Sequence, residues 1–580
     1  MTYNSQNPLI VQGDHTVLVE VDSPRYEKAR DHLARFAELV KSPEHVHTYR
    51  ITPLSIWNAS AAGMAAQQIQ SALNEYAKYD VPGHVLTEID NFASRYGRLR
   101  LHRGDDVLRL EAADAPLAEE IWRSEEARKY LESRDGALGF HILPLNRGRL
   151  KQVLVKIGWP IEDLAGYVDG EALDVALRDV TGEGLPFSLR PYQWEAVNVF
   201  YADGESTGGS GVITLPCGAG KTVVGMGVMA RVSTSTLILA TNVTAVRQWI
   251  REILDKTNLR PEQVGEYTGH AKDIRPVTVS TYQILTYRRS RQEEFVHFGL
   301  FDGRDWGLII YDEVHLLPAP VFQLTADIQA RRRLGLTATL VREDEREDDV
   351  FALIGPKKYD IPWKIMESQG WIATAVCTEV RVRLPEDLRM EYAVTDRRRK
   401  FRFASENPAK LPVLRRILDR HRDEQTLIIG TYVDHLRAIA DELKVPVLTG
   451  QTLSAQREKH YEDFRAGRLP VLIVSKVANF AVDLPDAAVA IQISGTFGSR
   501  QEEAQRLGRL LRPKAGANQA HFYTIVTRET VEQDFALRRQ LFLTEQGYAY
   551  EIIDAGVVGC EEHAEDRAGF RRAAGFGNAT

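Results

Sequence analysis

The chain has 580 residues, of which 44% are hydrophobic and 26% are charged, and its formal net charge is −7. This length exceeds what one hydrophobic core can organise and predicts about three to five domains, and the composition is that of an ordinary globular protein. The charge excludes a uniformly basic nucleic-acid-binding protein, although a local positive groove is compatible with it.

The cysteines and the N-terminus indicate a reducing, intracellular setting. Cys217, Cys377 and Cys560 are far apart and do not form a disulfide framework pattern. No apolar run is long enough to span a bilayer, and the first residues lack a basic region followed by an apolar one. We therefore expect a cytoplasmic location and no membrane partner.

The first part of the chain mixes helical and strand-like patterns. Leu54 to Tyr76 predicts one or two amphipathic helices, and Gly182 to Pro186 marks a domain boundary. His45 and His47 alternate along a predicted strand, and we interpret them as structural because no matching ligand cluster is nearby. Further short elements are a strand pair at 96–102 and 107–111 with a turn between, a strand at 139–143 and a helix at 147–157.

From residue 187 onward, apolar strands alternate with helical patterns, which is typical of a parallel sheet covered by helices. Two such blocks flank a charged, less regular middle around residues 356–410. The predicted strands lie at 236–240, 277–280, 307–311, 426–430, 471–475, 489–493 and 522–526. The predicted fold is α/β, with two parallel-sheet domains after an N-terminal mixed α/β region.

A glycine-rich turn follows the apolar run that ends at Thr214. It comprises Pro216, Cys217, Gly218, Ala219 and Gly220, and leads into Lys221 and Thr222 at the start of a predicted helix. Backbone N–H groups in such a turn hold phosphate oxygens, and the lysine adds a positive charge. Taken alone, the turn is also compatible with an ordinary loop, since Leu215 replaces the first glycine of the general pattern.

Two carboxylates, Asp312 and Glu313, follow the apolar run that ends at Tyr311. A carboxylate at the end of a buried strand holds Mg²⁺ opposite a phosphate loop, where Thr222 supplies a hydroxyl, and its neighbour can polarise the attacking water. A surface acidic pair is the alternative.

A row of arginines lies in the second block. Arg506, Arg509 and Arg512 are spaced at i, i+3, so on a helix they would lie near one face. Arginines supplied to a γ-phosphate stabilise the charge of the transition state, whereas a basic surface helix is the alternative.

Taken together and in this order, the motifs resemble those of superfamily 2 helicases, specifically the XPB family of DNA repair helicases. The likeness includes Leu189 to Gln193 before the phosphate loop, Asn242 to Trp249, Ser280 to Gln283, Gly335 to Thr339 and Ser475 to Pro485. Arg342-Glu343-Asp344 matches the RED element that this family uses at the point of strand separation.

The resemblance implies two RecA-like motor domains, ATP and Mg²⁺ as cofactors, and a set of site residues. The implied catalytic residues are Lys221, Asp312, Glu313, Gln505, Arg509 and Arg512, with Thr222 and Asp312 as metal ligands. The implied ATP-binding residues are Arg190, Gln193, Pro216, Cys217, Gly218, Ala219, Gly220, Lys221 and Thr222. The implied DNA-binding or unwinding residues are Gln248, Trp249, Thr281, Thr337, Thr339, Arg342, Glu343 and Asp344.

By the same resemblance, we expect an ATP-dependent 3′→5′ helicase that opens duplex, forked or bubble DNA in repair, associated with the nucleoid and with a structure-specific nuclease as partner. The expected domains are an N-terminal domain at 1–115, a small damage-recognition-like domain at 116–186, motor domains at 187–355 and 413–555, a linker with a thumb-like insertion at 356–412 and a tail at 556–580.

Three other functions remain open from the sequence. A double-stranded DNA translocase would remodel protein–DNA complexes with little unwinding. A scaffold would bind DNA without catalysis, and an RNA helicase would hydrolyse ATP in response to RNA.

Overall fold

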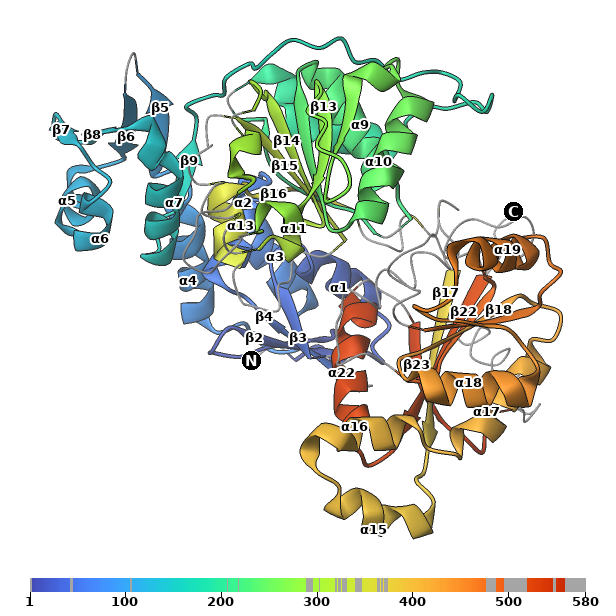
Figure 1. Ribbon diagram of the computed structural model, residues 1–580. Helices are drawn as coiled ribbons and strands as arrows, with labels where there is room; N and C mark the ends of the chain where they lie inside the picture. The colour runs from blue at the N-terminus through green and yellow to red at the C-terminus, as the bar shows by residue number, and fades with distance from the viewer. Residues whose placement is uncertain are drawn as a thin grey trace, which may run out of the picture. The chain divides into compact units, whose positions relative to one another are not determined.

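The computed structural model divides into two compact units, one covering most of residues 1–365 and the other beginning at Met366 (Figure 1). It describes the chain apart from residues 1–2, 42–44, 105–106, 206, 217, 288–295, 302, 319–320, 322–324, 326–330, 339–346, 362–365, 367–368, 370–373, 476–486, 495–518, 546–548 and 559–580. Within these described ranges, no helix is both long and apolar enough to cross a membrane.

The first unit begins with an antiparallel sheet in the strand order β1-β2-β4-β3. The predicted helical stretch from Leu54 to Tyr76 is two helices, α2 and α3, and α2 starts where the Thr52 side chain accepts the Ser55 N–H in a capping box. The elements are β1 (Leu9–Val11), β2 (Thr16–Glu20), α1 (Tyr26–Leu33), β3 (Glu38–Lys41), β4 (Val46–Arg50), α2 (Pro53–Ala61), α3 (Ala66–Tyr76) and α4 (Gly83–Arg95).

His47 is a structural residue of this sheet, as the sequence predicted. It lies on β4 with only 5% of its surface exposed, and its Nδ1 is 2.8 Å from the Tyr26 hydroxyl. Burial, together with the positive charge of Arg30, lowers the pKa of His47 to about 4. By contrast, His45 is 72% exposed and lies 3.3 Å from Asp22.

A second, smaller sheet follows in the order β7-β8-β6-β5-β9. The predicted strand pair is confirmed as the antiparallel hairpin β5–β6, and the predicted strand and helix near residues 139–157 are β8 and α7. The elements are β5 (Leu99–Arg103), β6 (Leu108–Ala112), α5 (Ala115–Arg123), α6 (Glu125–Arg128), β7 (Ser133–Asp135), β8 (Gly139–Ile142), η1 (Pro144–Asn146), α7 (Arg147–Lys156) and β9 (Ile161–Asp163).

The third sheet of this unit is parallel. Its order is β12-β13-β11-β14-β15-β10-β16, and every strand pair described in it is parallel. The strands are β10 (Ser210–Thr214), β11 (Thr236–Ala240), β12 (Val264–Tyr267), β13 (Val277–Thr281), β14 (Leu308–Asp312), β15 (Arg332–Thr337) and β16 (Lys357–Asp360). The helices are α8 (Pro191–Tyr201), η2 (Ala202–Gly204), α9 (Lys221–Val232), α10 (Val243–Lys256), η3 (Pro261–Gln263), α11 (Tyr282–Leu285), η4 (Phe298–Phe301), η5 (Val314–Leu316) and α13 (Glu347–Leu353).

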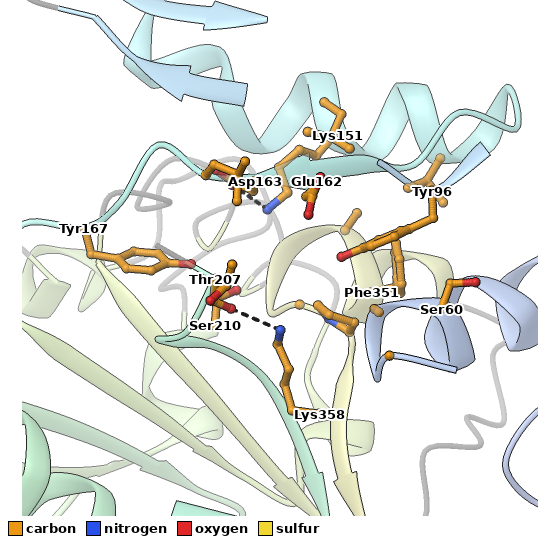
Figure 2. Close-up of a pocket in the computed structure, with 18 residues that line it drawn as sticks. Ser60, Tyr96, Lys151, Glu162, Asp163, Tyr167, Thr207, Ser210, Phe351 and Lys358 are labelled. Atoms are coloured by element: carbon orange, nitrogen blue, oxygen red, sulfur yellow. Dashed lines mark hydrogen bonds and ion pairs between the residues drawn. The ribbon is translucent and has the colours of Figure 1, made fainter. Parts of the chain in front are cut away.

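A cavity of about 190 Å³ lies where these three parts of the first unit meet (Figure 2). On one side, Asp163 accepts hydrogen bonds from Arg147 at 2.7 Å and from Lys151 at 3.0 Å. On the other side, Lys358 donates to the Thr207 carbonyl at 3.0 Å. Burial alone would raise the pKa of Asp163, but its two cationic partners outweigh this effect and hold the pKa well below its usual range.

The second unit contains another parallel sheet, in the order β19-β20-β18-β21-β22-β17-β23. Its strands are β17 (Thr374–Val382), β18 (Thr426–Gly430), β19 (Val447–Leu448), β20 (Val471–Ser475), β21 (Val489–Gln492), β22 (Gln519–Thr527) and β23 (Ala549–Asp554). Its helices are α15 (Glu386–Val394), α16 (Arg397–Ser405), α17 (Lys410–Arg420), α18 (Val433–Leu443), α19 (Ser454–Arg465) and α22 (Val531–Glu545). The predicted fold class, with two RecA-like parallel sheets, is confirmed.

The stretch that we expected to be a linker contributes strands to both parallel sheets. β16 pairs with β10 in the first unit, and β17 lies between β22 and β23 in the second. β17 was missed because charged residues interrupt its apolar pattern. One of them, Glu379, is 1% exposed and accepts hydrogen bonds from Arg381 and the Tyr550 hydroxyl.

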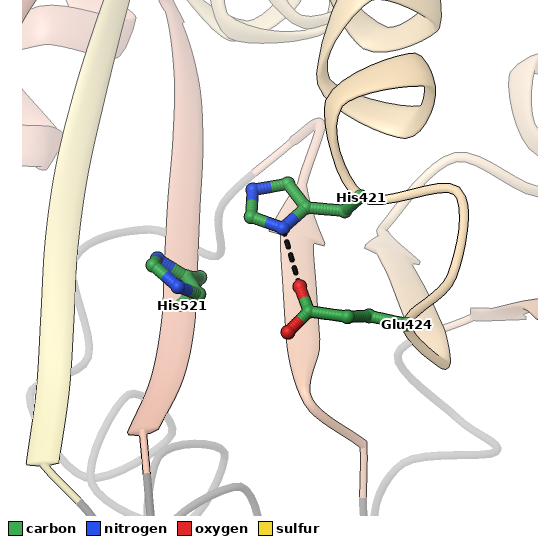
Figure 3. Close-up of side chains that lie close together, drawn as sticks. All are labelled: His421, Glu424 and His521. Atoms are coloured by element: carbon green, nitrogen blue, oxygen red, sulfur yellow. Dashed lines mark hydrogen bonds and ion pairs between the residues drawn. The ribbon is translucent and has the colours of Figure 1, made fainter. Parts of the chain in front are cut away.

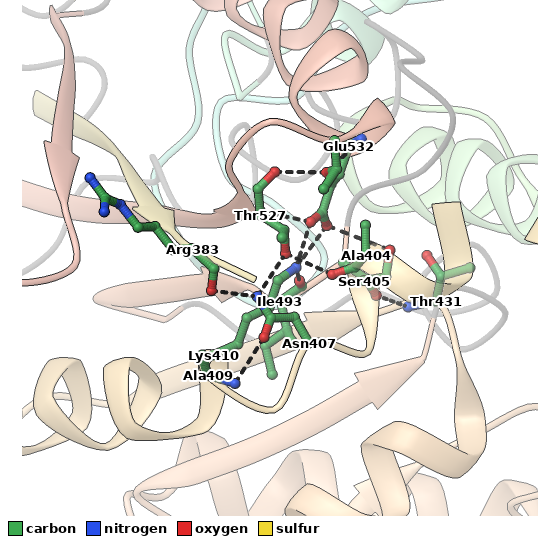
Figure 4. Close-up of polar contacts among 12 residues, drawn as sticks. Arg383, Ala404, Ser405, Asn407, Ala409, Lys410, Thr431, Ile493, Thr527 and Glu532 are labelled. Atoms are coloured by element: carbon green, nitrogen blue, oxygen red, sulfur yellow. Dashed lines mark hydrogen bonds and ion pairs between the residues drawn. The ribbon is translucent and has the colours of Figure 1, made fainter. Parts of the chain in front are cut away.

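A buried ion pair joins α17 to α22 in the second unit (Figure 4). The Lys410 ammonium donates to both carboxylate oxygens of Glu532, at 2.7 and 2.8 Å, and to the Ile493 carbonyl at 2.7 Å. Glu532 also accepts the Thr527 N–H at 2.9 Å. The ends of β21 and β22 are thereby tied to two helices through charges that are 1–2% exposed.

The lowered pKa of His47 predicts that the stability of the N-terminal sheet depends on pH. The unfolded chain protonates this histidine below its ordinary pKa of 6.5, whereas the folded chain does so only near 4, so stability is lost as the pH falls through this window. Between about pH 7 and about pH 5, we expect the opening free energy of β4 to fall by about 2 kcal/mol. Hydrogen exchange of peptides covering residues 46–50 measures it.

His47→Gln should flatten this pH dependence, and the exposed neighbour His45 provides the matched control. His45→Gln should keep the wild-type profile. An unchanged profile in His47→Gln would contradict the assignment.

Candidate nucleotide-binding site

Three sequence motifs converge at one edge of the first parallel sheet. β14, β15 and β10 are neighbours in that order, and the chain leaves their carboxyl ends at Asp312, Thr337 and Thr214. Ligands of open parallel sheets bind at this edge, outside the carboxyl ends of the strands. The site is therefore assembled from three segments that lie far apart in the sequence, between Thr214 and Thr337.

The glycine-rich turn has the backbone that its residues require. Gly218 and Gly220 have φ angles of 82° and 81°, and α9 begins at Lys221 directly after Gly220. A Cβ atom at Gly220 would lie 2.5 Å from Nε2 of Gln193, so a side chain would be both strained and obstructed there. Thr222 follows, half-buried, in the first turn of α9.

Gln193 and its neighbour Tyr192 hold the turn from α8. The Gln193 amide donates to the Ala219 carbonyl at 3.0 Å and accepts the Arg190 N–H at 2.9 Å. The Tyr192 hydroxyl donates to the same Ala219 carbonyl at 2.8 Å. By resemblance we expected Gln193 to bind ATP. Its described contacts hold the phosphate loop, and the part played by Tyr192 was not predicted.

Lys221 and Glu313 form an ion pair at the centre of the site. Their Nζ and Oε1 atoms are 2.6 Å apart, and their side chains are 13% and 15% exposed. Glu313 has a left-handed backbone, with φ 51° and ψ 57°, which costs a non-glycine residue about 1–3 kcal/mol. This strain turns the chain directly after β14 and leaves Glu313 facing the phosphate loop.

The pKa values of the two adjacent carboxyl groups are shifted in opposite directions. Burial, followed by the Glu313 charge, raises the pKa of Asp312 well above its ordinary value. Burial also acts to raise the pKa of Glu313, but Lys221 and His315 outweigh it and hold that pKa below its usual range. Glu313 is therefore the more acidic carboxyl group of the pair.

Trp249 corrects one of our predictions. We expected it to contact DNA, but its side chain is 1% exposed, and its indole N–H donates to Oδ2 of Asp312 at 2.9 Å. A buried indole offers no surface to a DNA backbone. Trp249 is instead a positioning residue for Asp312, packed on the side of α10 that faces the sheet, where an apolar residue fits the helical period.

A buried hydrogen bond links η5, which follows β14, to the end of β15. The ring Nδ1 of His315 lies 2.6 Å from the hydroxyl of Thr337, and both residues are buried. Thr281 is 3% exposed, and its hydroxyl caps α11 by accepting the Ile284 N–H. The hydroxyls of Thr281 and Thr337 therefore make contacts inside the domain, whereas Gln248 on α10 is half-buried.

Several predicted site residues lie outside the described residues. They are Cys217, Thr339, Arg342, Glu343, Asp344, Gln505, Arg509 and Arg512. The structure brings together Lys221, Asp312 and Glu313 with the turn at Pro216 to Gly220, and it adds Tyr192 and His315 to them. His315 directly follows the Asp312–Glu313–Val314 run, which was the available sequence signal.

The Gly220 geometry predicts a loss of nucleotide affinity in Gly220→Ala. The added Cβ would displace Gln193 and move the turn, so we expect the Kd of a fluorescent nucleoside triphosphate to rise about 10-fold or more. Gly136→Ala is the matched control, because Gly136 has a φ of 69° but nothing within 4 Å of its Cβ position. Equal affinities in the two variants would contradict this role of Gly220.

Comparisons with known proteins identify the family of this chain. A family model described as the ERCC3/RAD25/XPB C-terminal helicase matches residues 366–569, one described as a helicase conserved C-terminal domain matches 9–135, and one described as a type III restriction enzyme res subunit matches 186–342. The proteins named "DNA 3′-5′ helicase XPB" of Kineococcus radiotolerans and Mycobacterium tuberculosis are each 53% identical over 95% of this chain, covering 97% and 98% of their own lengths. An Enterocytozoon bieneusi protein named "General transcription and DNA repair factor IIH helicase/translocase subunit XPB" is 31% identical over 95% of this chain and 94% of its own length. With its ordered motifs, its two parallel sheets and these relatives, the chain belongs to the XPB family of helicases.

Proposed function

We propose that this chain is an ATP-dependent 3′→5′ DNA helicase that opens duplex DNA during repair. The observation that carries the proposal is the Lys221–Glu313 ion pair beside Asp312, at the edge of a parallel sheet in an XPB-family chain. This arrangement supplies a cation for phosphate and a buried carboxylate that can act as a base.

The ion pair suggests how ATP would activate the site. Lys221 pairs with Glu313, and a triphosphate would attract the ammonium away from this carboxylate. Glu313 would then be available to orient and deprotonate the attacking water. Nucleotide binding would thus release Glu313 from Lys221, so the general base becomes available only when a triphosphate is bound.

The oxygen donors of Thr222 and Asp312 suit Mg²⁺, which prefers hard oxygen ligands. When bound, Mg²⁺ would neutralise the charge that develops on the phosphates. The Trp249 N–H fixes one carboxylate oxygen of Asp312 and so orients the group. The roles implied for Gln505, Arg509 and Arg512, which complete the site by resemblance, remain part of this proposal.

For DNA, we propose contacts that are mainly to phosphates and therefore sensitive to salt. α15 and α16 occupy the chain position of the thumb-like insertion, and α16 exposes Arg399 at 84% and Arg402 at 52%. The His315–Thr337 bond would link the hydrolytic residues to the segment that by resemblance couples ATP state to DNA grip. A structure-specific nuclease partner and a nucleoid location rest on resemblance alone.

Lys221→Ala tests the enzyme proposal. We expect wild-type ATPase activity to rise with DNA more than with RNA, and the variant to lose about 100-fold or more of it, since a preorganised charge at the phosphates is removed. Lys256→Ala, in a surface group with Glu252 and Asp255, is the matched control and should keep the activity. Equal rates in wild type and Lys221→Ala would favour a non-catalytic scaffold, and stimulation by RNA instead of DNA would favour an RNA helicase.

Strand displacement separates a helicase from a double-stranded DNA translocase. The name of the Enterocytozoon bieneusi relative contains both terms. We expect the wild type to displace a strand from forked DNA, and Glu343→Ala to lower displacement by a larger factor than ATPase. DNA-stimulated ATPase without displacement on duplex, forked or bubble DNA would overturn the helicase proposal in favour of translocation.

A further inference from the structure

Two histidines and a glutamate gather in the second unit (Figure 3). One ligand atom from each of His421, Glu424 and His521 lies within 4.8 Å of the others. In the part of the chain that the structure describes, this is the single group of three or more such residues with this closeness.

The fold brings these residues together from positions a hundred residues apart. His421 is the C-cap residue of α17, and Glu424 follows one turn later, just before β18. α17 packs through Val413 and Ile417 on the core that contains Tyr523 of β22, and His521 lies two residues before Tyr523 on the same face of that strand. The end of α17 is thereby held against His521.

The side chains are already oriented toward one another. The centroids of the His421 and His521 rings are 4.8 Å apart. Nδ1 of His421 is 2.5 Å from Oε2 of Glu424, and Nε2 of His421 is 2.9 Å from the Tyr523 hydroxyl. His421 is 7% exposed, whereas Glu424 is 40% exposed. A fixed central imidazole thus lies between a half-buried imidazole and a carboxylate that solvent can reach.

We propose that His421, Glu424 and His521 form a binding site for a transition-metal ion of the Zn²⁺ class. Two imidazoles and one carboxylate are a donor set that suits Zn²⁺ and leaves a fourth position for water, whereas Mg²⁺ and Ca²⁺ prefer oxygen donors.

The geometry requires only small side-chain movements. Tetrahedral bonds of about 2.0–2.1 Å separate ligand atoms by about 3.3 Å, so the Glu424 carboxylate retreats by about 0.8 Å from Nδ1 of His421 and His521 turns inward. Both are the more exposed members of the group. The ion would also lie at the C-terminal end of α17, where the helix dipole favours a positive charge.

The site lies at one edge of the second parallel sheet. His521 is level with Val489, the first residue of β21, and Glu424 precedes β18 by two residues. The site therefore lies at the amino edge of this sheet. A metal ion there would fasten α17 to β22 and raise the stability of the second unit without taking part in the reaction.

Zn²⁺ titration of the full-length chain tests this site. After treatment with a chelator, the number of Zn²⁺ equivalents and their Kd are measured by competition with a chromophoric chelator. We expect His521→Ala to lose one equivalent or to weaken it about 100-fold, and Glu424→Gln to weaken it about 10- to 100-fold. Zn²⁺ should raise the Tm of the wild type and leave that of His521→Ala unchanged.

His435→Ala, which changes a histidine of α18 outside the group, is the matched control and should bind Zn²⁺ as the wild type does. The visible absorption of bound Co²⁺ gives a second measurement that needs no variant, and it should report a nitrogen- and oxygen-ligated site. If His521→Ala binds the same equivalents with the same Kd as the wild type, or if no Co²⁺ band develops, the group is a hydrogen-bonded cluster without a metal function. DNA-stimulated ATPase of His521→Ala without added Zn²⁺ should match the wild type, so either outcome is independent of the helicase proposal.

Discussion

The ion pair between Lys221 and Glu313 is the interaction on which the first motor domain depends. It joins the helix after β10 to the turn after β14, across the intervening strand β15. The neighbouring groups serve this contact: Trp249 fixes Asp312, and Gln193 and Tyr192 hold the loop from which α9 starts. Glu313, whose backbone is strained, contacts Lys221 and His315 through its side chain.

The sequence predicted most of the elements that carry short apolar runs. β11 and β18 lie where the runs at 236–240 and 426–430 indicated, since strands of a covered parallel sheet are buried on both faces. β17 escaped prediction because Glu379 and Arg381 interrupt its apolar residues, and only the structure shows that Glu379 has hydrogen-bond donors in the core.

For the candidate site too, the sequence predicted some features and not others. Residue types and spacing were sufficient to select Lys221, Asp312 and Glu313, because their chemistry requires those side chains in that order along the chain. The direction in which a side chain points was not available from the sequence. Trp249 lies on an amphipathic helix whose buried face faces the sheet, and His421 and His521 are adjacent only through packing of α17 on β22.

Buried charges restrict how the helices can be placed. Asp163 in the first unit and Glu532 in the second each accept hydrogen bonds from cations that are almost fully buried. Removing one partner from such a pair costs about 3–5 kcal/mol, because the remaining charge is left without compensation. A slightly different packing of α7 or α17 would incur this penalty, so these pairs favour one arrangement over similar alternatives.

The position of β17 has a consequence for synthesis on the ribosome. Among the described strands, β17 (Thr374–Val382) pairs with β22 and β23, which end at Thr527 and Asp554. During translation, β17 therefore stays unpaired while more than a hundred further residues are added before β22 is complete. Pairings so distant in sequence form slowly and leave strand edges open to wrong partners. Protection by a chaperone during this interval would matter more for the second motor domain than for the four-stranded N-terminal sheet, whose described strands pair within the first fifty residues.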